Sequence, residues 1–428
     1  MRTLVIGMGI TGQALVRFLQ ERGEPFDTFD DGKLRHELDL EASVNHFNHV
    51  DSVDPSQYDR ALVSPGLPRD HAVTQALIAS GAPVLSEIEL AFVHAPGKVI
   101  AVTGSNGKST TASLIHHLLA GAGLKSSLCG NIGKPFISCI DDDPDHHYVV
   151  EVSSFQLEHV ISFRPAIGLL LNISPDHLVW HGGFEAYEAA KLRLFARQQP
   201  DDLALICSNY LERIPGQATK RPMPGPGASI IDGELDLGDT YRVALNRLPL
   251  LGKHNHSNAL FACAVAKQFG VSAQTVTALL PSFKGLEHRM ERVGELDGRL
   301  WINDTKATNV QACQAVADAM EQPYVLILGG CDKGESYSDL DFSMRPPRHI
   351  VAYGETAEQI CMDLAHLAPR RVHLFRDACV TAQEIANPGD VVLLAPACAS
   401  FDQFDNFAQR GRVFKRIFAE LANVGEPQ

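Results

Sequence analysis

A glycine-rich segment with a lysine and two hydroxyls, TGSNGKST at residues 103–110, carries the clearest chemistry in the sequence. It follows the apolar run Lys98–Gly104 and precedes leucines at helical spacing, so it joins a predicted strand to a predicted helix. In such a loop, glycines let the backbone wrap phosphate oxygens, while the helix N-terminus and a lysine supply positive charge. The general pattern has glycine where this chain has Val102, so the loop is a shortened variant. We predict nucleotide binding by Gly104, Asn106, Gly107, Lys108, Ser109 and Thr110, with Ser109 or Thr110 reaching Mg²⁺; the alternative is a turn with a surface lysine.

A second glycine-rich turn, GMGITG at residues 7–12, follows the predicted strand Thr3–Gly7. A G-x-G-x-x-G turn between a strand and a helix is typical of dinucleotide binding, and Asp30 lies where a ribose-binding acid is expected. The same turn is compatible with close helix–strand packing and no ligand. The phosphate loop about 95 residues later argues against a nicotinamide dehydrogenase.

Polar residues accompany two further apolar runs, Tyr148–Ser154 and Ile167–Ser174. Glu151 lies in the first run, and the segment NISPDH follows the second and ends with His177. The carboxyl ends of parallel strands share one edge of a sheet, which is also where the phosphate loop is expected. An acid and an imidazole beside nucleotide phosphates suggest a site for Mg²⁺, which keeps several of its waters. The alternative is a strand-end turn in which Asp176 caps a helix.

Lys191 lies on the apolar stripe of a predicted helix over residues 184–195, together with Phe184, Tyr187 and Leu194. Burial destabilises an ammonium group, so the pKa of a buried lysine falls and its amine becomes nucleophilic. A neutral amine can capture CO₂ as a carbamate, which is a metal-binding anion. Periodicity alone favours the simpler interpretation, a lysine whose stem is buried and whose charged end reaches water.

Three loops in the last third of the chain carry acids, lysines and hydroxyls after predicted strands. They are NDTKATN at 303–309, GGCDKG at 329–334 and ACASFD at 397–402. If the strands are neighbours, their loops meet at one sheet edge, and Lys306, Lys333 and Ser400 can build one anion pocket. The alternative is three unrelated polar loops.

The elements that must position these loops predict an α/β fold. Short runs rich in Val, Ile and Leu alternate with glycine or proline turns and helical stretches, as in βαβ units with buried parallel strands. We expect three domains, over residues 1–90, 91–285 and 286–428. Residues 215–227, rich in Pro and Gly, should form an exposed loop. Further predicted elements are strands at Pro25–Phe29, Arg60–Val63, Leu300–Thr305, Tyr324–Gly330, His349–Gly354, Arg371–Phe375 and Asp390–Ala397, and a closing helix over 404–421.

Composition limits the class of protein. The chain has 428 residues and a net charge of 37 − 51 = −14, which argues against a general nucleic-acid binder. No apolar run approaches the roughly 18–20 residues that span a bilayer, and the first residues lack the length and cleavage region of a signal peptide. Nine scattered cysteines without C-x-x-C suit a reducing compartment. We expect a cytoplasmic monomer with no nucleic-acid partner and no membrane insertion.

Taken together, the motifs resemble the Mur ligases, the ATP-dependent enzymes that extend the peptide of peptidoglycan precursors. The resemblance covers essentially the whole chain, and its motifs run in one order: GMGITG, TGSNGKST, GNIG, EVSSFQLE, NISPDH, AAKLRLF, GKHN, HRME, NDTKATN, GGCDKG and PACASFDQF. It is most specific to the members that add D-glutamate to UDP-N-acetylmuramoyl-L-alanine. It implies two Rossmann-like domains, an N-terminal one for the UDP-sugar and a C-terminal one for the amino acid, around a central phosphate-loop ATPase domain.

The resemblance also implies roles at matching positions. The catalytic residues are expected to be Lys108, His177 and Lys191. ATP phosphates and Mg²⁺ are expected at Lys108, Ser109 and Thr110, and the metal ions also at Glu151, His177 and a carbamylated Lys191. Further ATP contacts are expected from Asn255, Arg289, Asp304 and Lys306. The UDP-sugar is expected at Gly9, Thr11, Asp30 and Gly66, with its muramoyl-alanine end at Asn131 and His177. The glutamate carboxylates are expected at Thr308, Lys333, Ser400 and Phe407.

Two positions depart from the family pattern. Val179 stands where D-H-[LM]-D has its second acid, which leaves a metal or orienting role there open, and Thr305 stands where serine is commoner. The implied reaction forms an acyl phosphate from ATP, which the glutamate amine then attacks. Alternatives are a related amide ligase, either folylpolyglutamate synthase-like or specific for L-glutamate, and a non-catalytic nucleotide-binding regulatory protein.

Overall fold

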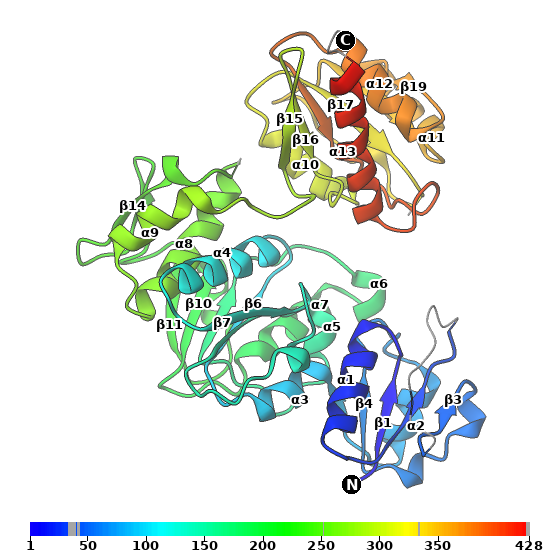
Figure 1. Cartoon of the computed structure of the whole chain (residues 1–428), viewed down its shortest axis with the longest axis vertical. Coiled ribbons are helices and arrows are strands. Elements are labelled where there is room, and N and C mark those ends of the chain that lie inside the picture. The colour runs from blue at the N-terminus through cyan, green and yellow to red at the C-terminus, as the bar shows by residue number, and fades with distance from the viewer. Residues whose placement is uncertain (33–39, 41–42, 251, 333, 425–428) are drawn as a thin grey trace. The chain divides into compact units, whose positions relative to one another are not determined.

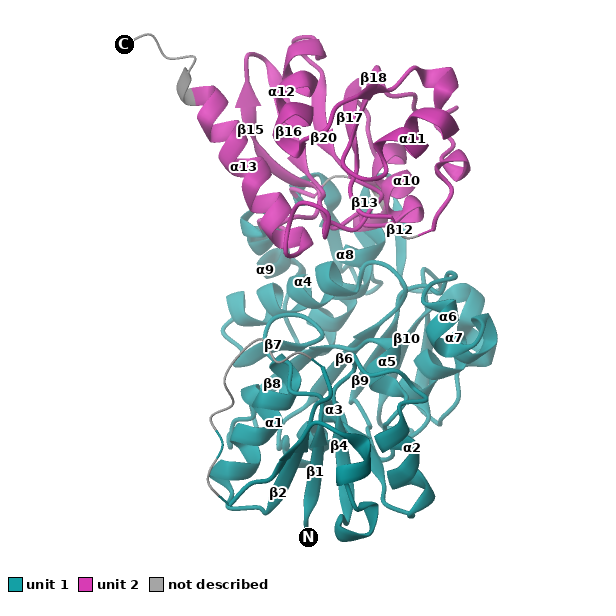
Figure 2. Cartoon of the chain, turned by 90° about the vertical axis from the view of Figure 1, so that its right-hand side faces the viewer, with its two compact units in different colours: residues 1–248, 256–283 teal, residues 249–255, 284–428 magenta. Residues whose placement is uncertain are grey.

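The computed structural model describes residues 1–32, 40, 43–250, 252–332 and 334–424. The chain divides into two compact units, one of residues 1–248 and 256–283 and one of residues 249–255 and 284–428 (Figure 2). Each unit contains predominantly parallel sheets with helices packed on them (Figure 1), which is the predicted α/β class. No helix among the described residues is long and apolar enough to cross a membrane.

The first sheet has the strand order β3-β2-β1-β4-β5, and all its strands are parallel. Buried Val, Leu, Ile and Phe side chains fill its strands, as the continuous apolar runs predicted. Its strands are β1 (Thr3–Ile6), β2 (Phe26–Phe29), β3 (His46–Phe47), β4 (Arg60–Val63) and β5 (Val84–Ser86). Its helices are α1 (Ile10–Glu21), α2 (Ala72–Ala79) and α3 (Glu87–His94).

The second sheet, in the same unit, is parallel with the order β11-β10-β9-β6-β8-β7. Its central strand β6 lies between β9 and β8, so the segments that follow these three strands meet at one edge. Its strands are β6 (Val99–Thr103), β7 (Ser126–Gly130), β8 (His147–Glu151), β9 (Ile167–Leu170), β10 (Leu203–Cys207) and β11 (Thr219–Met223). The helices are α4 (Lys108–Gly121), α5 (Ser154–Leu157), α6 (Leu178–His181), α7 (Phe184–Leu192), α8 (Lys253–Gln268) and α9 (Ala273–Leu279), and a small antiparallel sheet has β12 (Ser229–Ile231), β13 (Glu234–Asp236) and β14 (Arg242–Ala244).

Residues 215–227 are not only a loop, as the sequence suggested, because β11 lies within them and pairs with β10. Pro222 has no N–H to donate, which excludes it from a central strand. Strand β11 is at the edge of the sheet, where proline is tolerated.

The third sheet, in the other unit, has the order β15-β16-β20-β17-β18-β19, with only β15 antiparallel to its neighbour. Separate apolar clusters pack on its two faces. Its strands are β15 (Glu291–Leu296), β16 (Arg299–Asn303), β17 (Tyr324–Gly329), β18 (His349–Tyr353), β19 (Arg370–Arg371) and β20 (Val391–Leu394). Its helices are α10 (Val310–Asp318), α11 (Ala357–Asp363), α12 (Phe375–Ile385) and α13 (Phe407–Val424).

The predicted strand Arg371–Phe375 is wrong over most of its length. Strand β19 ends at Arg371, and helix α12 begins at Phe375. Phe375 is buried together with Ala378, Cys379 and Ala382, which is helical spacing. The run therefore lies mostly between β19 and α12, with only Phe375 in the amphipathic helix, and an apolar run of a few residues cannot by itself be assigned to a strand or a helix.

Candidate active site

The phosphate loop lies between β6 and α4, and its geometry requires glycine. Gly107 has a φ of +84° and is the N-cap of α4; a Cβ there would lie 2.4 Å from Asn258 Oδ1. Gly104 has a φ of +155°, also in the region that favours glycine. The loop therefore brings backbone close to the start of α4, where N–H groups and the helix dipole favour an anion.

Two polar side chains hold this loop in shape. Asn172, after β9, accepts a hydrogen bond from Asn106 N at 2.8 Å, and its Nδ2 donates to Asn106 O at 3.0 Å. Ser105 Oγ donates to Ser174 O at 2.9 Å and lies 2.8 Å from the hydroxyl of Tyr187. Neither Asn172 nor Ser105 was predicted as a site residue, although both lie within the motifs NISPDH and TGSNGKST.

Two lysines converge on one carbonyl of the loop. Lys108 Nζ donates to Gly104 O at 2.7 Å and to Ser105 O at 2.8 Å, and Lys191 Nζ donates to the same Gly104 O at 2.9 Å. Lys191 is only 1% exposed, and its Nζ lies 4.6 Å from the ring centroid of Tyr187. Burial, followed by the charge of Lys108, holds the pKa of Lys191 well below its ordinary value. The interpretation of Lys191 as a lysine that reaches water is therefore wrong, and its surroundings favour the neutral amine.

Glu151 ends β8, and its charge acts on Lys191. Its side chain is buried; Oε1 accepts a hydrogen bond from Asn131 Nδ2 at 2.7 Å, and Oε2 has no hydrogen-bond partner among the described residues. A buried carboxylate oxygen left in this way fits a ligand of positive charge. Within the described part of the chain, no three His, Cys, Asp or Glu side chains group as a metal site. The Glu151 carboxylate and the Ser109 hydroxyl carry hard oxygen atoms of the kind that Mg²⁺ prefers, and a carbamate on Lys191 stays a prediction.

His177 lies after β9 and begins α6 with a left-handed backbone, φ 52°. Its side chain is half exposed, its ring packs 4.8 Å from that of Phe155, and its Nε2 lies 3.5 Å from Asp176 Oδ2. Asp176 is not the helix cap that the alternative interpretation required, because His177 occupies the N-cap position. The charge of Asp176 instead acts on Lys191, a role that the sequence did not suggest.

The N-terminal glycine turn is closely packed. A Cβ on Gly12 would lie 2.0 Å from Gly7 O, and Ser64 Oγ donates to the same carbonyl at 2.6 Å. Asp30 Oδ2 accepts a hydrogen bond from Met8 N at 2.6 Å, so the predicted ribose-binding acid also supports the turn. The other residues predicted to bind the UDP-sugar lie at the surface: Gly9 and Gly66 are exposed, and Thr11 is half-buried.

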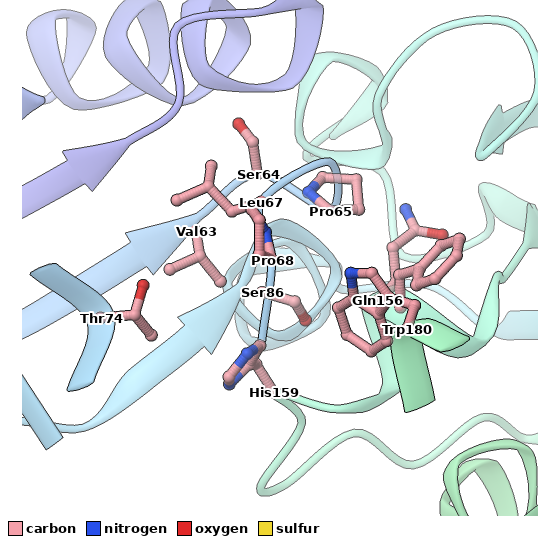
Figure 3. A pocket seen from close by; sticks show the side chains of 11 residues that line it. Val63, Ser64, Pro65, Leu67, Pro68, Thr74, Ser86, Gln156, His159 and Trp180 are labelled. Atoms are coloured by element: carbon pink, nitrogen blue, oxygen red, sulfur yellow. The ribbon is translucent and has the colours of Figure 1, made fainter. Parts of the chain in front are cut away.

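A small cavity lies beside this turn, between the segment after β4 and the residues around Gln156 and Trp180 (Figure 3). Its volume of about 10 Å³ is close to the minimum that holds one water molecule. None of the four residues predicted to bind the UDP-sugar in this domain lines it. It is too small for a sugar nucleotide in this structure.

In the C-terminal unit, the three polar loops meet around one buried arginine. Arg410, on α13, is 0% exposed. Its guanidinium donates to Thr305 O at 3.1 Å, Cys398 O at 3.0 Å, Ala399 O at 3.2 Å and Gly329 O at 3.4 Å. The loops are therefore adjacent, as predicted, and the alternative of three unrelated loops is wrong. Arg410 itself was missed, because no motif distinguishes it from other arginines in the closing helix.

The predicted ligand-binding residues of this unit have different environments. Asp304 is buried and accepts a hydrogen bond from Met290 N at 3.0 Å; burial raises its pKa to about 6. Lys306 is exposed, with its Nζ 4.1 Å from the ring centroid of Phe407. Of the others, Asn255 and Ser400 are buried, Arg289 and Thr308 are half-buried, and Lys333 lies outside the described residues.

Comparison with known proteins shows which family the chain belongs to. Three family models match: the MurD-like N-terminal domain of Mur ligases over residues 1–86, the Mur ligase middle domain over 102–224, and the Mur ligase glutamate ligase domain over 288–398. A UDP-N-acetylmuramoylalanine–D-glutamate ligase from Alkaliphilus metalliredigens is 35% identical over 98% of both chains. One from Acidobacterium capsulatum is 38% identical over 97% of this chain and 95% of its own length. The chain belongs to the Mur ligase family.

Solved structures share the fold of this Mur ligase. The UDP-N-acetylmuramate–alanine ligase MurC from Thermotoga maritima aligns with a TM-score of 0.61 at 16% identity, over 98% of this chain and 99% of that one. MurF ligase from the same organism, solved in complex with ADP, aligns with a TM-score of 0.58 at 14% identity, over 87% and 97%. At these sequence identities the similarity shows a shared fold and nothing more specific.

Proposed function

We propose that this Mur ligase joins D-glutamate to UDP-N-acetylmuramoyl-L-alanine, with ATP as the energy source, in the synthesis of peptidoglycan precursors. It is an enzyme, an ATP-dependent carbon–nitrogen ligase. The observation that carries the substrate assignment is the full-length match, at 35–38% identity, to relatives named for this reaction. The three family models, found in the order of the three expected domains, support it.

The chemistry follows from the weakness of a carboxylate as an acyl donor. The alanine carboxylate attacks the γ-phosphorus of ATP and becomes an acyl phosphate, and ADP leaves. Lys108 and the N–H groups at the start of α4 offset the charge that develops on the transferred phosphoryl group. The glutamate amine then attacks the acyl carbon, a tetrahedral intermediate forms, and phosphate leaves. Holding the reactants in line can lower the barrier by about 7–11 kcal/mol through proximity.

Mg²⁺ would be held by Ser109, Glu151, His177 and a carbamylated Lys191, and the bound ion would neutralise phosphate charge. The buried Lys191 amine and the unpaired Glu151 Oε2 support this assignment. The chain itself keeps Lys191 away from water, which favours the neutral amine, and uses Asn131 to fix the Glu151 carboxylate.

The remaining assignments are proposals on the same basis. ATP would contact Asn255, Arg289, Asp304 and Lys306. Glutamate would bind at Thr308, Lys333, Ser400 and Phe407. The UDP-sugar would bind at Gly9, Thr11, Asp30 and Gly66, and its alanine would face Asn131 and His177.

Phosphate release from ATP tests the function. We expect release only when both UDP-N-acetylmuramoyl-L-alanine and glutamate are present, and faster turnover with D- than with L-glutamate. Preference for L-glutamate would reassign the stereochemistry, and activity with a folate substrate would reassign the enzyme class. ATP binding without turnover under every combination would support the regulatory alternative.

A further inference from the structure

One buried imidazole connects the three segments that carry the proposed metal site. The first segment is the end of β8, at Glu151, which leads into α5. The second is the stretch after β9 that contains His177, and the third is α7, which contains Lys191. His181, the last residue of α6, has a side chain that is 0% exposed. It belongs to none of the motifs named above, and no role was predicted for it.

His181 forms hydrogen bonds from both ring nitrogens. Its Nε2 lies 2.9 Å from Ser154 Oγ, at the start of α5, and its Nδ1 lies 3.2 Å from Glu158 Oε1, at the end of α5. Arg193, directly after α7, donates from NH1 to Glu158 O at 2.8 Å and pairs with the Glu158 carboxylate. A continuous chain of hydrogen bonds therefore runs from α6 through α5 to the end of α7, two residues after Lys191.

Backbone and ring contacts extend this chain to the site itself. His181 N donates to His177 O at 3.2 Å, so the two histidines share one helical turn. The His181 ring stacks on Phe155 at 5.5 Å and 8°, and Phe155 in turn contacts His177. The His181 ring also packs edge-on against the ring of Tyr187, with 5.3 Å between the ring centroids. The hydroxyl of Tyr187 in turn contacts Ser105 of the phosphate loop.

The order Ser154–His181–Glu158 is that of a hydrolase triad, but the serine cannot act as a nucleophile. Ser154 is 2% exposed, which closes it to a substrate. Burial lowers the pKa of His181, against the opposing charge of Glu158. A neutral ring that donates to Glu158 from Nδ1 must accept from Ser154 at Nε2. Each nitrogen thus fixes a different end of α5.

We propose that His181 is a positioning residue that sets Glu151, His177 and Lys191 in the relative placement required to bind the divalent cation. The proposal rests on the proposed function, because it takes these three as the metal site. Some residues do not bind a metal themselves but orient the residues that do. Their removal typically lowers metal affinity or activity about 10–100-fold.

The test uses variants that cut the chain at different bonds. His181→Ala removes both bonds, His181→Asn retains a donor near Glu158, and Ser154→Ala removes only the other end. The matched control is His116→Asn in the same unit, where His116 Nδ1 lies 2.9 Å from Ser126 Oγ on the β7 side of the sheet. Thermal melting checks folding, electron paramagnetic resonance measures Mn²⁺ binding in the presence of ADP, and steady-state kinetics give kcat and each KM.

We expect His181→Ala to weaken Mn²⁺ binding and lower kcat by about 10–100-fold, with the KM for glutamate changed less than about twofold. His181→Asn and Ser154→Ala should fall between wild type and His181→Ala, and His116→Asn should match wild type. If His181→Ala does not fold, the other two variants decide. Variants that melt earlier but keep wild-type Mn²⁺ affinity and kcat would overturn the proposal. A wild-type protein that binds Mn²⁺ yet makes no product with D-glutamate would contradict the proposed function and leave the binding comparison valid.

Discussion

The middle domain and the C-terminal unit both place polar loops after neighbouring parallel strands, yet their basic side chains make contacts of opposite kinds. In the middle domain, Lys108 and Lys191 share the carbonyl of Gly104, and Glu151 Oε2 has no hydrogen-bond partner among the described residues. In the C-terminal unit, Arg410 donates to four backbone carbonyls. Two lysine amines on one carbonyl, beside a carboxylate oxygen with no partner among the described residues, indicate a place for a ligand. A cation whose hydrogen bonds all go to backbone carbonyls and to the hydroxyls of Thr305 and Tyr353 indicates a scaffold.

The largest effect is expected at Lys108. Lys108→Ala removes the charge that we assign to the transferred phosphoryl group, and we expect kcat to fall by about 10³-fold, the upper range for one stabilising donor. UDP-substrate affinity should remain nearly intact, because that ligand is assigned to the N-terminal turn. The measurements are phosphate release and UDP-substrate titration.

Lys125→Ala is the matched control, since Lys125 is an exposed lysine that pairs with Asp143. It should be nearly neutral for activity. Equal loss of UDP-substrate affinity in folded Lys108→Ala would contradict the separation of the two sites.

Arg410 tests the scaffold half of the comparison. Arg410→Met leaves several buried carbonyls without a donor, and hydrogen bonds to charged groups are worth about 1.5–3 kcal/mol each. We expect the free energy of unfolding of this unit to fall by at least about 3 kcal/mol. Urea unfolding followed by tryptophan fluorescence measures it, because Trp301 is buried in this unit.

Arg416→Met, at an exposed position on the same helix, should change stability by less than about 0.5 kcal/mol. If Arg410→Met is as stable as the Arg416 variant but has lost ATP binding, Arg410 is a ligand-binding residue and not a scaffold.

Lys191 tests the ligand half. Lys191→Arg keeps a positive charge but cannot form a carbamate, and arginine is too long for a site that is 1% exposed. We expect activity to fall about 10²-fold, in the range seen when an electrostatic group of an active site is lost. Near-normal turnover in phosphate-release assays would exclude a carbamate at this position.

Much of this comparison could be predicted from the sequence, and the limits are physical. Continuous apolar runs predicted β6, β8 and β9 to within a few residues, because a strand that is buried on both faces consists almost entirely of apolar residues. The place of Lys191 on an apolar helical face could be predicted, but the burial of its amine could not, because a stripe does not show whether a lysine end reaches water. Arg410 and His181 could not be found at all. Their roles depend on partners distant in sequence, such as Thr305 and Ser154, which only the tertiary fold brings together.

Glu87 provides a test of whether a buried carboxylate oxygen without a partner among the described residues always indicates a ligand. Like Glu151, it has an Oε2 with no hydrogen-bond partner among the described residues, but burial raises its pKa to about 7. An acid whose folded pKa lies above its unfolded value of 4.5 stabilises the fold below pH 4.5, and that contribution is lost as the pH rises through 7. We expect wild type to lose about 2 kcal/mol of stability between pH 5 and pH 8 relative to Glu87→Gln. Urea unfolding of both proteins at the two pH values measures the difference, and parallel behaviour would place a cation beside Glu87.

The smallest effect is expected at Lys333, and it follows from what Arg410 cannot do. Glutamate brings two carboxylates to a protein of net charge −14, so its pocket needs dedicated donors. Because Arg410 is directed to backbone carbonyls and buried hydroxyls, we assign the glutamate carboxylates to Thr308, Ser400 and Lys333 of the three polar loops. A charge-assisted hydrogen bond is worth about 1.5–3 kcal/mol, so Lys333→Ala should raise the KM for glutamate at least about tenfold. The KM values for ATP and the UDP-substrate should change little, and Lys333→Arg should recover part of the loss. Three separate KM titrations on the folded variants decide between sites, because a raised KM for ATP with an unchanged KM for glutamate would assign Lys333 to the nucleotide.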